Sequence, residues 1–463
     1  MTEQLKLKLN DSKATRWGAL VIVAFTMMAA YYVNDVVAPL KTMLETDLAW
    51  SSTDFGFFTG GYSFLNVFFL MLIWGGLILD RFGIRFTGKL ATILMVGGTA
   101  LEYYAMTGLA GADATLFGIN EIFGYKTGVF VAFAGYSIFG VGAEVAGITV
   151  SKIIAKWFKG KELATAMGVQ VALARIGSQA GYAVAIPLAR AFGISTPVLL
   201  GLVLLLGGMI AFFVFAVMDK KLDKQMEAAA IAAGTEDEEE KFSFKDVKNI
   251  LVNPGFWLIA LLCVLFYSCV FPFQKFASEL MIIKYGINEN VAGTFAGLPA
   301  LGALILTPVF GGFIDKRGKS ASIMLLGSAM LICVHFIYAI PDINYWLVAI
   351  VLMIILGIAF SLVPSAMWPA VAKIFPVSQL GTAYALIFFI QNIGLWGIPT
   401  LIGWVLDAYC ISGKKPDGTN MYDYTVPMCI FTGIACLSLI VALLLKKADK
   451  KYGYKLEELN IQK

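Results

Sequence analysis

Long apolar stretches separated by short polar segments run along most of the chain. A helix needs about 20 mostly apolar residues to cross the hydrocarbon layer of a membrane. Twelve stretches of that kind are present, at 17–37, 54–79, 88–109, 128–155, 163–191, 197–218, 255–282, 290–314, 320–340, 344–371, 379–406 and 424–445. The pattern predicts an all-α integral membrane protein with twelve transmembrane helices in a lipid bilayer.

The longest polar stretch away from the termini separates six of these predicted helices from the other six. It carries the acidic run 236–240, and charge runs of this kind are usually solvated linkers. We therefore expect an N-terminal six-helix bundle at 1–218, a cytoplasmic linker at 219–253, a C-terminal six-helix bundle at 254–447 and a cytoplasmic tail at 448–463.

Composition and charge agree with a membrane protein. The 463 residues are 59% apolar and 14% charged, whereas soluble domains run about 45–50% apolar and about 25% charged. If both termini are cytoplasmic, the cytoplasmic segments hold 27 of the 35 Lys and Arg residues and the opposite loops hold six. This bias follows the positive-inside rule, so the net charge of +4 gives no reason to expect nucleic acid as a partner.

A loop pattern recurs after the second predicted helix of each half. Each copy has a Gly four residues before an Asp, a basic residue directly after the Asp, and another Gly three residues beyond it. The residues are Gly76, Asp80, Arg81, Gly83, Gly311, Asp315, Lys316 and Gly318. We expect the first Gly to let neighbouring helices approach closely and the second to permit a tight turn.

Two such loops, one in each half, resemble the cytoplasmic signature of the major facilitator superfamily. The resemblance implies two six-helix bundles related by an axis along the membrane normal, around a central cavity that opens to alternate sides. The loop residues are then conformational latches rather than substrate ligands. They are Asp80, Arg81, Arg85 and Asp315.

Charged residues in the middle of a span are costly and usually face a cavity or a partner. Glu144 is at the middle of the fourth predicted span among small residues, and Arg175 is at the middle of the fifth. They could pair with each other and neutralise two buried charges. Alternatively, they are held apart for a substrate that carries both an ammonium and a carboxylate, because the planar fork of Arg binds both carboxylate oxygens.

The sequence around these two residues is similar to the family of lysosomal dipeptide uniporters known as major facilitator superfamily domain-containing protein 1. The similar segments are 157–163, 174–178, 270–273, 367–369, 379–384 and 391–392. In that family an acidic residue of the fourth span and an arginine of the fifth hold the charged ends of a dipeptide. The resemblance therefore implies that Glu144 binds the ammonium of a dipeptide, that Arg175 binds its carboxylate, and that transport is uniport.

Other predicted site residues rest on weaker signals. Tyr267, Asn392 and Trp396 lie within the seventh and eleventh spans and could contact a peptide, or could equally serve helix packing. Asp35 and Lys275 lie in the first and seventh spans, which face each other in this fold. We expect them to form a gating ion pair.

Several alternatives remain open from the sequence. A proton-coupled carrier of organic anions or sugars is one, although Glu144 would repel an anion unless protonated; a non-transporting membrane sensor is another. No nucleophile–base arrangement, phosphate loop, or metal or disulfide spacing is found, so we expect neither an enzyme nor a cofactor. The chain is expected to be a monomer. Because residues 1–10 show no acidic dileucine sorting signal, we expect it in the plasma membrane with both termini cytoplasmic.

Overall fold

The computed structural model describes residues 8–111, 114–158, 161–233 and 244–459, so the acidic run 236–240 lies outside the described residues. The described chain is almost entirely helical. Its helices are α1 (Lys13–Val36), the 3-10 helix η1 (Ala38–Leu40), α2 (Lys41–Leu48), α3 (Ser52–Phe68), α4 (Met71–Thr107), α5 (Thr127–Trp157), α6 (Leu163–Phe192), α7 (Thr196–Ala233), α8 (Phe244–Val252), α9 (Pro254–Tyr285), α10 (Glu289–Ala296), α11 (Leu298–Arg317), α12 (Ser320–Ala339), α13 (Trp346–Ile374), α14 (Val377–Tyr409) and α15 (Thr425–Tyr452). Two short antiparallel hairpins pair β1 (Glu121–Ile122) with β2 (Tyr125–Lys126) and β3 (Ile411–Lys414) with β4 (Asn420–Tyr422).

Each predicted span coincides with one helix or with parts of two consecutive helices. By length and apolar composition alone, nine of the described helices could cross a membrane, or ten if the bent pair α3 and α4 forms one span. This number is below twelve because α4 runs from the second predicted span into the third, and because α6 mixes polar residues with its apolar ones. The all-helical membrane fold is confirmed.

The second predicted span is not continuous, which corrects the expectation of one helix over 54–79. A capping box of Ser51 and Asp54 starts α3, which ends at Phe68. Leu70 has a left-handed backbone (φ 54°), and α4 then leaves at an angle of 58° to α3. A non-glycine residue with positive φ cannot continue a right-handed helix, so the span breaks inside its apolar stretch.

The two signature glycines of the loops make the turns that the sequence predicts. Gly83 has φ 74° and Gly318 has φ 66°, a region that glycine enters without steric cost. The packing role expected of Gly76 and Gly311 is wrong in this conformation, since a Cβ at either position would meet no atom within 4 Å. The close contact belongs to Gly75 instead, where a Cβ would lie 2.5 Å from α5.

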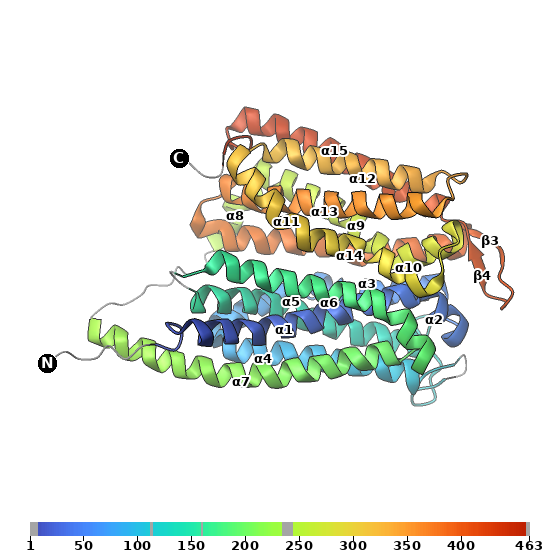
Figure 1. Cartoon of the computed structure of the whole chain (residues 1–463), viewed down its shortest axis with the longest axis horizontal. Helices are drawn as coiled ribbons and strands as arrows, with labels where there is room; N and C mark the ends of the chain where they lie inside the picture. The colour runs from blue at the N-terminus through green and yellow to red at the C-terminus, as the bar shows by residue number, and fades with distance from the viewer. Residues whose placement is uncertain (1–7, 112–113, 159–160, 234–243, 460–463) are drawn as a thin grey trace.

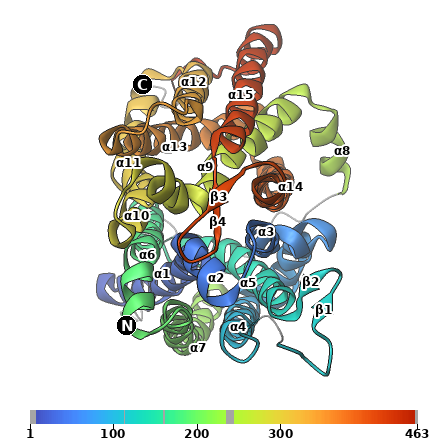
Figure 2. The ribbon, with the colours of Figure 1, turned by 90° about the vertical axis from the view of Figure 1, so that its right-hand side faces the viewer.

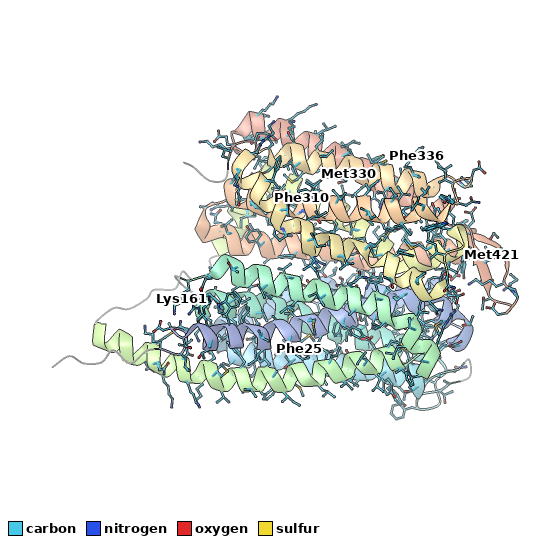
Figure 3. The ribbon with its side chains drawn as sticks, in the orientation of Figure 1. Phe25, Lys161, Phe310, Met330, Phe336 and Met421 are labelled. Atoms are coloured by element: carbon cyan, nitrogen blue, oxygen red, sulfur yellow. The ribbon has the colours of Figure 1, made fainter. Side chains whose placement is uncertain are left out.

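The helices form two halves that lie side by side, α1–α7 and α9–α15 (Figures 1 and 2). Both chain termini lie at one end of the molecule, called here the terminal end, and the β3–β4 hairpin and α2 lie at the opposite, remote end (Figure 1). Lys161 marks the terminal end and Met421 the remote end in Figure 3. Large apolar side chains face outward, as Phe336 does with 55% exposure, which suits a surface in contact with lipid.

Helical structure extends into the segment between the halves. α7 continues to Ala233, and α8 precedes α9. The side chain of Asn253 caps α9 by accepting from the backbone N–H of Gly255 at 2.8 Å, and Pro254 occupies the first turn. The second half therefore starts at a well-defined helix terminus.

Candidate functional site: a charged cavity between the halves

The two halves meet along two seams towards the remote end. In the first seam, α3 and α14 approach backbone to backbone. A Cβ at Gly56 would lie 2.4 Å from the Pro399 carbonyl oxygen, and one at Gly403 would lie 2.2 Å from that of Ser52. Asp407 of α14 also accepts a hydrogen bond from the backbone N–H of Ser52 at 3.3 Å. Glycine makes this approach possible, because any side chain would separate the helices.

The second seam joins α6 to α10. A Cβ at Gly293 would lie 2.3 Å from the carbonyl oxygen of Tyr182. Arg190 donates to the Asn290 side chain at 2.7 Å and also forms an ion pair with Glu289. The halves are thus closed on one another at the remote end.

A cavity lies between the halves. It holds about 970 Å³ of free space, including the part open to solvent. The residues that line it are Met27, Ala30, Tyr31, Asn34, Thr59, Tyr62, Tyr136, Ala143, Glu144, Gly147, Phe271, Pro272, Lys275, Phe388, Gln391, Leu395 and Pro399. They come from α1, α3 and α5 of the first half and α9 and α14 of the second. The two charged residues of this lining are Glu144 and Lys275.

Glu144 projects from α5 where small residues leave room beside its carboxylate. Its Oε1 accepts a hydrogen bond from the Tyr62 hydroxyl of α3 at 3.0 Å. Gly140, one turn earlier, lets α3 come this near, since a Cβ there would lie 2.0 Å from the Tyr62 carbonyl oxygen. The carboxylate is held in place by a neutral donor, and within the described residues it forms no ion pair.

Arg175 projects from α6 and lies between aromatic rings rather than on Glu144. Its guanidinium carbon lies 5.5 Å from the ring centre of Tyr31 and 4.9 Å from that of Phe360, which belongs to the other half. Tyr31 lines the cavity, and Arg175 flanks the cavity behind that ring. The alternative in which Glu144 and Arg175 neutralise each other is therefore wrong for this conformation.

Asp35 and Lys275 lie together, as the sequence suggests. Lys275 Nζ is 3.3 Å from Asp35 Oδ1, 2.5 Å from the carbonyl oxygen of Asn34 and 3.4 Å from the Tyr136 hydroxyl. The Tyr136 hydroxyl in turn donates to the Asn34 carbonyl at 2.8 Å. A lysine of the second half is thus bound by three groups of the first half at the cavity wall.

The three other candidate site residues lie behind the cavity lining. Tyr267 stacks on Phe271, with ring centres 5.5 Å apart, and Phe271 lines the cavity. Asn392 is buried, and its amide donates to the Phe388 carbonyl at 3.0 Å within α14. Trp396 packs edge-to-face on Phe68 of the first half at 4.7 Å. In this conformation these residues support the wall, and contact with a substrate stays a prediction.

A buried group of four charged residues at the remote end was not predicted from the sequence. Lys41 Nζ lies 2.5 Å from Glu45 Oε1 and 2.6 Å from Glu279 Oε2, and Lys41 is only 1% exposed. Lys415 Nζ, from the turn of the β3–β4 hairpin, lies 3.8 Å from a carboxylate oxygen of both Glu45 and Glu279. We call Lys41, Glu45, Glu279 and Lys415 the remote-end charge cluster; it joins the two halves.

The β3–β4 hairpin ties this cluster to the α3–α14 seam. The ring of Tyr422 lies 4.7 Å from Lys41 Nζ, and its hydroxyl donates to Asp407 Oδ1 at 2.7 Å. Tyr424, just after the hairpin, donates to Glu279. The i,i+4 spacing of Lys41 and Glu45 is a sequence signal for an ion pair within one helix. It could not predict the other two members of the cluster, which lie more than 200 residues away.

The predicted latch residues lie at the terminal end. Asp80 pairs with Lys152 at 3.1 Å, and Arg85 pairs with Asp223 at 2.6 Å, all four within the first half. Arg81 lies over the ring of Phe82 at 5.6 Å. Asp315 occupies the last turn of α11. Their role as latches stays a prediction.

The start of α1 and the segment before it are tied to the turn between α5 and α6. Arg16 donates to Glu162 at 2.8 Å, and Lys161 pairs with Asp11 at 2.8 Å. Hydrogen bonding from Arg16 holds the pKa of the Glu162 carboxyl below its ordinary value, and hydrogen bonding from Lys161 does the same for the pKa of Asp11. Glu162 belongs to one of the segments that carry the dipeptide-uniporter resemblance.

Within the described residues, no group of three or more His, Cys, Asp or Glu side chains could hold a metal ion. The single histidine, His335, is buried, and its Nε2 lies 3.0 Å from the Cys269 carbonyl oxygen. It lies in α12 and is not part of the cavity lining. The charged groups that line or flank the cavity are Glu144, Arg175 and Lys275.

Comparisons with known proteins agree with this architecture. Residues 20–399 and 276–457 match the model of the Major Facilitator Superfamily. The lysosomal dipeptide transporter MFSD1 of Homo sapiens is 29% identical over 409 residues, covering 85% of this chain and 81% of that protein. MFSD1 of Gallus gallus is 33% identical over 287 residues, which cover 59% of this chain and 62% of the relative.

Solved structures of transporters share the fold. A peptide transporter POT in complex with sulfate superposes with a TM-score of 0.66 at 15% identity, covering 95% of both chains. The nucleoside transporter NupG superposes with a TM-score of 0.68 at 12% identity, covering 92% of this chain and 98% of the other. With a family match that extends over nearly the whole chain and two helical halves around a cavity, this chain belongs to the Major Facilitator Superfamily and is a multi-pass membrane transporter, not an enzyme.

Proposed function

We propose that the protein carries dipeptides across the membrane as a uniporter, with Glu144 binding the peptide ammonium and Arg175 the peptide carboxylate. The observation that carries this proposal is that two opposite charges, Glu144 in the cavity lining and Arg175 flanking the cavity behind Tyr31, do not neutralise each other. Glu144 is bound by a neutral hydroxyl, and Arg175 lies between two rings. A zwitterion supplies the missing partner for both.

The energetics favour a substrate with two charged ends. A partly dehydrated charge is costly unless it is paired, so a cavity with an unpaired acid and an unpaired base binds a zwitterion better than a single ion. Hydrogen bonds to charged groups contribute roughly 1.5–3 kcal/mol each. The rings of Tyr31 and Phe360 hold the guanidinium plane, which suits a two-pronged bond to a carboxylate.

The cavity leaves open space for a substrate beside Glu144. About 970 Å³ of free space, including the part open to solvent, lies between the halves. An extended dipeptide spans about 7 Å between its ends. The relatives from Homo sapiens and Gallus gallus are dipeptide transporters, which adds support for this substrate class.

The same geometry suggests how access alternates. The remote end is closed by the two seams, by the Asp35–Lys275 pair and by the remote-end charge cluster. Transport requires these contacts to separate while contacts at the terminal end form. We place the remote end outside the cytoplasm and both termini inside, in a plasma membrane, although the relatives are lysosomal.

Counterflow into proteoliposomes tests the substrate class. Labelled Ala-Ala, Ala-Lys and Ala-Asp would each be offered to liposomes loaded with unlabelled dipeptide, without an ion gradient. We expect accumulation that other dipeptides abolish and that single amino acids and sugars do not. Absence of any dipeptide exchange, together with uptake of organic anions under a proton gradient, would replace this proposal with a proton-coupled carrier.

Two variants test the two charged ends. Glu144→Gln and Arg175→Lys should each raise the half-saturating dipeptide concentration about 10- to 100-fold, as loss of a charged hydrogen bond predicts. Glu121→Gln, at an exposed carboxylate of β1, serves as the matched control and should not change it. Binding of a dipeptide whose N-terminus is acetylated should be weak in the parent protein and insensitive to Glu144→Gln.

A further inference from the structure

One buried carboxyl group has no partner. Glu102 of α4 is 0% exposed, and neither of its carboxyl oxygens has a hydrogen-bond partner in the part of the chain that the structure describes. By contrast, Asp35, Glu45 and Glu279 each lie against a lysine. An isolated buried carboxylate anion is strongly disfavoured, so Glu102 holds a proton in this conformation.

Glu102 lies beside the network that closes the cavity towards the remote end. A Cβ at Gly135 of α5 would lie 2.9 Å from the backbone nitrogen of Glu102, so α4 and α5 touch at this point. The next residue, Tyr136, lines the cavity and contacts Lys275 and Asn34 through its hydroxyl. A change of charge at Glu102 therefore alters the electrostatic potential at the contact between the two halves.

Within the described residues, titratable groups near Glu102 come from several helices. Towards the remote end, the helices packed on α4 carry Asp35 (α1), Asp54 (α3), Tyr136 (α5) and Asp407 (α14), while α7 carries no ionisable residue between 196 and 217. Asp54 and Asp407 are bonded to backbone N–H groups at the start of α3, and tyrosines stay neutral below about pH 9. Lys275, from α9, is the cation of the adjacent network, where its Nζ lies 3.4 Å from the Tyr136 hydroxyl.

We propose that Glu102 is a proton-binding site, and that its protonation stabilises the conformation closed at the remote end. The proposal rests on the alternating access described above but not on the identity of the substrate. The proton is a modulator in this scheme and is not carried with the substrate. The site thus makes the balance between conformations depend on pH.

Two effects of ionising Glu102 oppose each other. The anion would attract Lys275 and so favour closure, but the two side chains are not in contact within 4.0 Å, and Lys275 already contacts Asp35 at 3.3 Å and the Asn34 carbonyl at 2.5 Å. Dehydration of the anion opposes closure, and for a buried carboxylate without contacts it is the larger effect. The closed conformation should therefore lose population as pH rises, by on the order of tenfold per unit above the titration of Glu102.

A cysteine at Ser278 reports opening without any substrate. Ser278 lies on α9 between Lys275 and Glu279, three and one residues away, on the face of α9 that meets the first half. It is 1% exposed, and its hydroxyl has no hydrogen-bond partner within the described residues, so a thiol loses no bond. In a background free of native cysteines, an impermeant maleimide added from the remote side labels the Ser278→Cys protein only when that side opens.

The test compares labelling rates from pH 5.5 to 8.5 in three proteins. The reporter alone, and the reporter with Glu102→Asp, keep a titrating group; the reporter with Glu102→Gln does not. Dividing by the rate in the Gln variant removes the intrinsic pH dependence of the thiol. For the parent, we expect this ratio to be close to one at pH 5.5 and to rise at least tenfold as pH increases. For Glu102→Asp we also expect it to rise with pH.

Different outcomes separate this proposal from the substrate assignment. A ratio that stays flat or falls with pH would overturn the proton site, and so would a Gln variant that opens more than the parent at low pH. If Glu102→Gln does not fold, the labelling rate of the parent is divided instead by the rate for a cysteine in an unfolded peptide. The pH dependence of that ratio decides the question in the same way. A pH-dependent ratio in a protein that exchanges no dipeptide would leave the proton site standing while the dipeptide proposal fails.

Discussion

Replacement of Lys41 by Met should release the remote end of the molecule. Lys41 Nζ lies within 2.6 Å of carboxylates from both halves, Glu45 and Glu279, and its side chain is 1% exposed. Without it, Lys415 is the one cation of the cluster that remains for two buried carboxylates, and it lies 3.8 Å from each. Opening would hydrate both anions, so the variant should favour the open conformation.

The expected size follows from the geometry. At about 3 Å and an effective dielectric constant of about 20, each ion pair contributes roughly 5 kcal/mol of attraction, most of which offsets the dehydration of the charges. Removing one partner of a buried pair nevertheless costs about 3–5 kcal/mol, because the other charge is left uncompensated. A shift of about 3 kcal/mol changes the ratio of closed to open molecules by roughly a hundredfold.

Labelling of the Ser278→Cys reporter from the remote side measures this shift. We expect labelling of the Lys41→Met protein to rise by roughly a hundredfold, up to the limit set by full opening, and to fall back in part when Glu279→Gln is added. Lys414→Met is the matched control, because Lys414 is an exposed lysine of the same hairpin bonded to Asn420. Equal labelling of the Lys41→Met and Lys414→Met proteins would refute the role of the remote-end charge cluster in closure.

Three further predictions follow from single contacts. Gly403→Ala should hold the remote end open, since its Cβ would lie 2.2 Å from the α3 backbone, and transport should fall while labelling of the reporter rises. Tyr62→Phe removes the hydrogen bond to Glu144 and should raise the half-saturating dipeptide concentration about tenfold with little change in maximal rate. The hydrogen bond from Arg16 lowers the pKa of Glu162, so its contribution to stability is complete above the ordinary pKa of Glu and is lost as pH falls through the lowered pKa. A spin label on the turn between α5 and α6 should therefore gain mobility when the solution is acidified and not when it is made alkaline.

The sequence predicted the fold well because its signals are local. Apolar length defines the spans, and the loop glycines at 83 and 318 indicate turns that need positive φ. The break at Leu70 was missed because the stretch around it is uniformly apolar, and neither Gly nor Pro marks it. Packing of Gly75 rather than Gly76 depends on which face of α4 meets α5, and no local pattern distinguishes two adjacent glycines.

The candidate site was predictable only in part. Mid-span charges identify Glu144, Arg175 and the Asp35–Lys275 pair from sequence, because a charged side chain at that depth is costly unless it faces a cavity or a partner. The partners of Lys41 could not be predicted from the sequence. Lys41 and Lys415 lie in segments that look like loops, where a lysine is usually an exposed surface charge. Their burial arises only when segments distant in the chain fold against each other at the remote end.

The proposed gate and the proposed substrate site differ in whether their charged residues have partners of opposite charge. Lys41 with Glu279, and Lys275 with Asp35, are pairs of buried charges whose members come from different halves. Such pairs stabilise one conformation and need no ligand, because each charge already has its partner. Glu144 and Arg175 have no oppositely charged partner in the described chain, and both lie at or beside the cavity. A ligand with two opposite charges is what such a pair lacks, so the physical rule that favours a role in closure for the paired residues also supports the proposed role of Glu144 and Arg175 in binding.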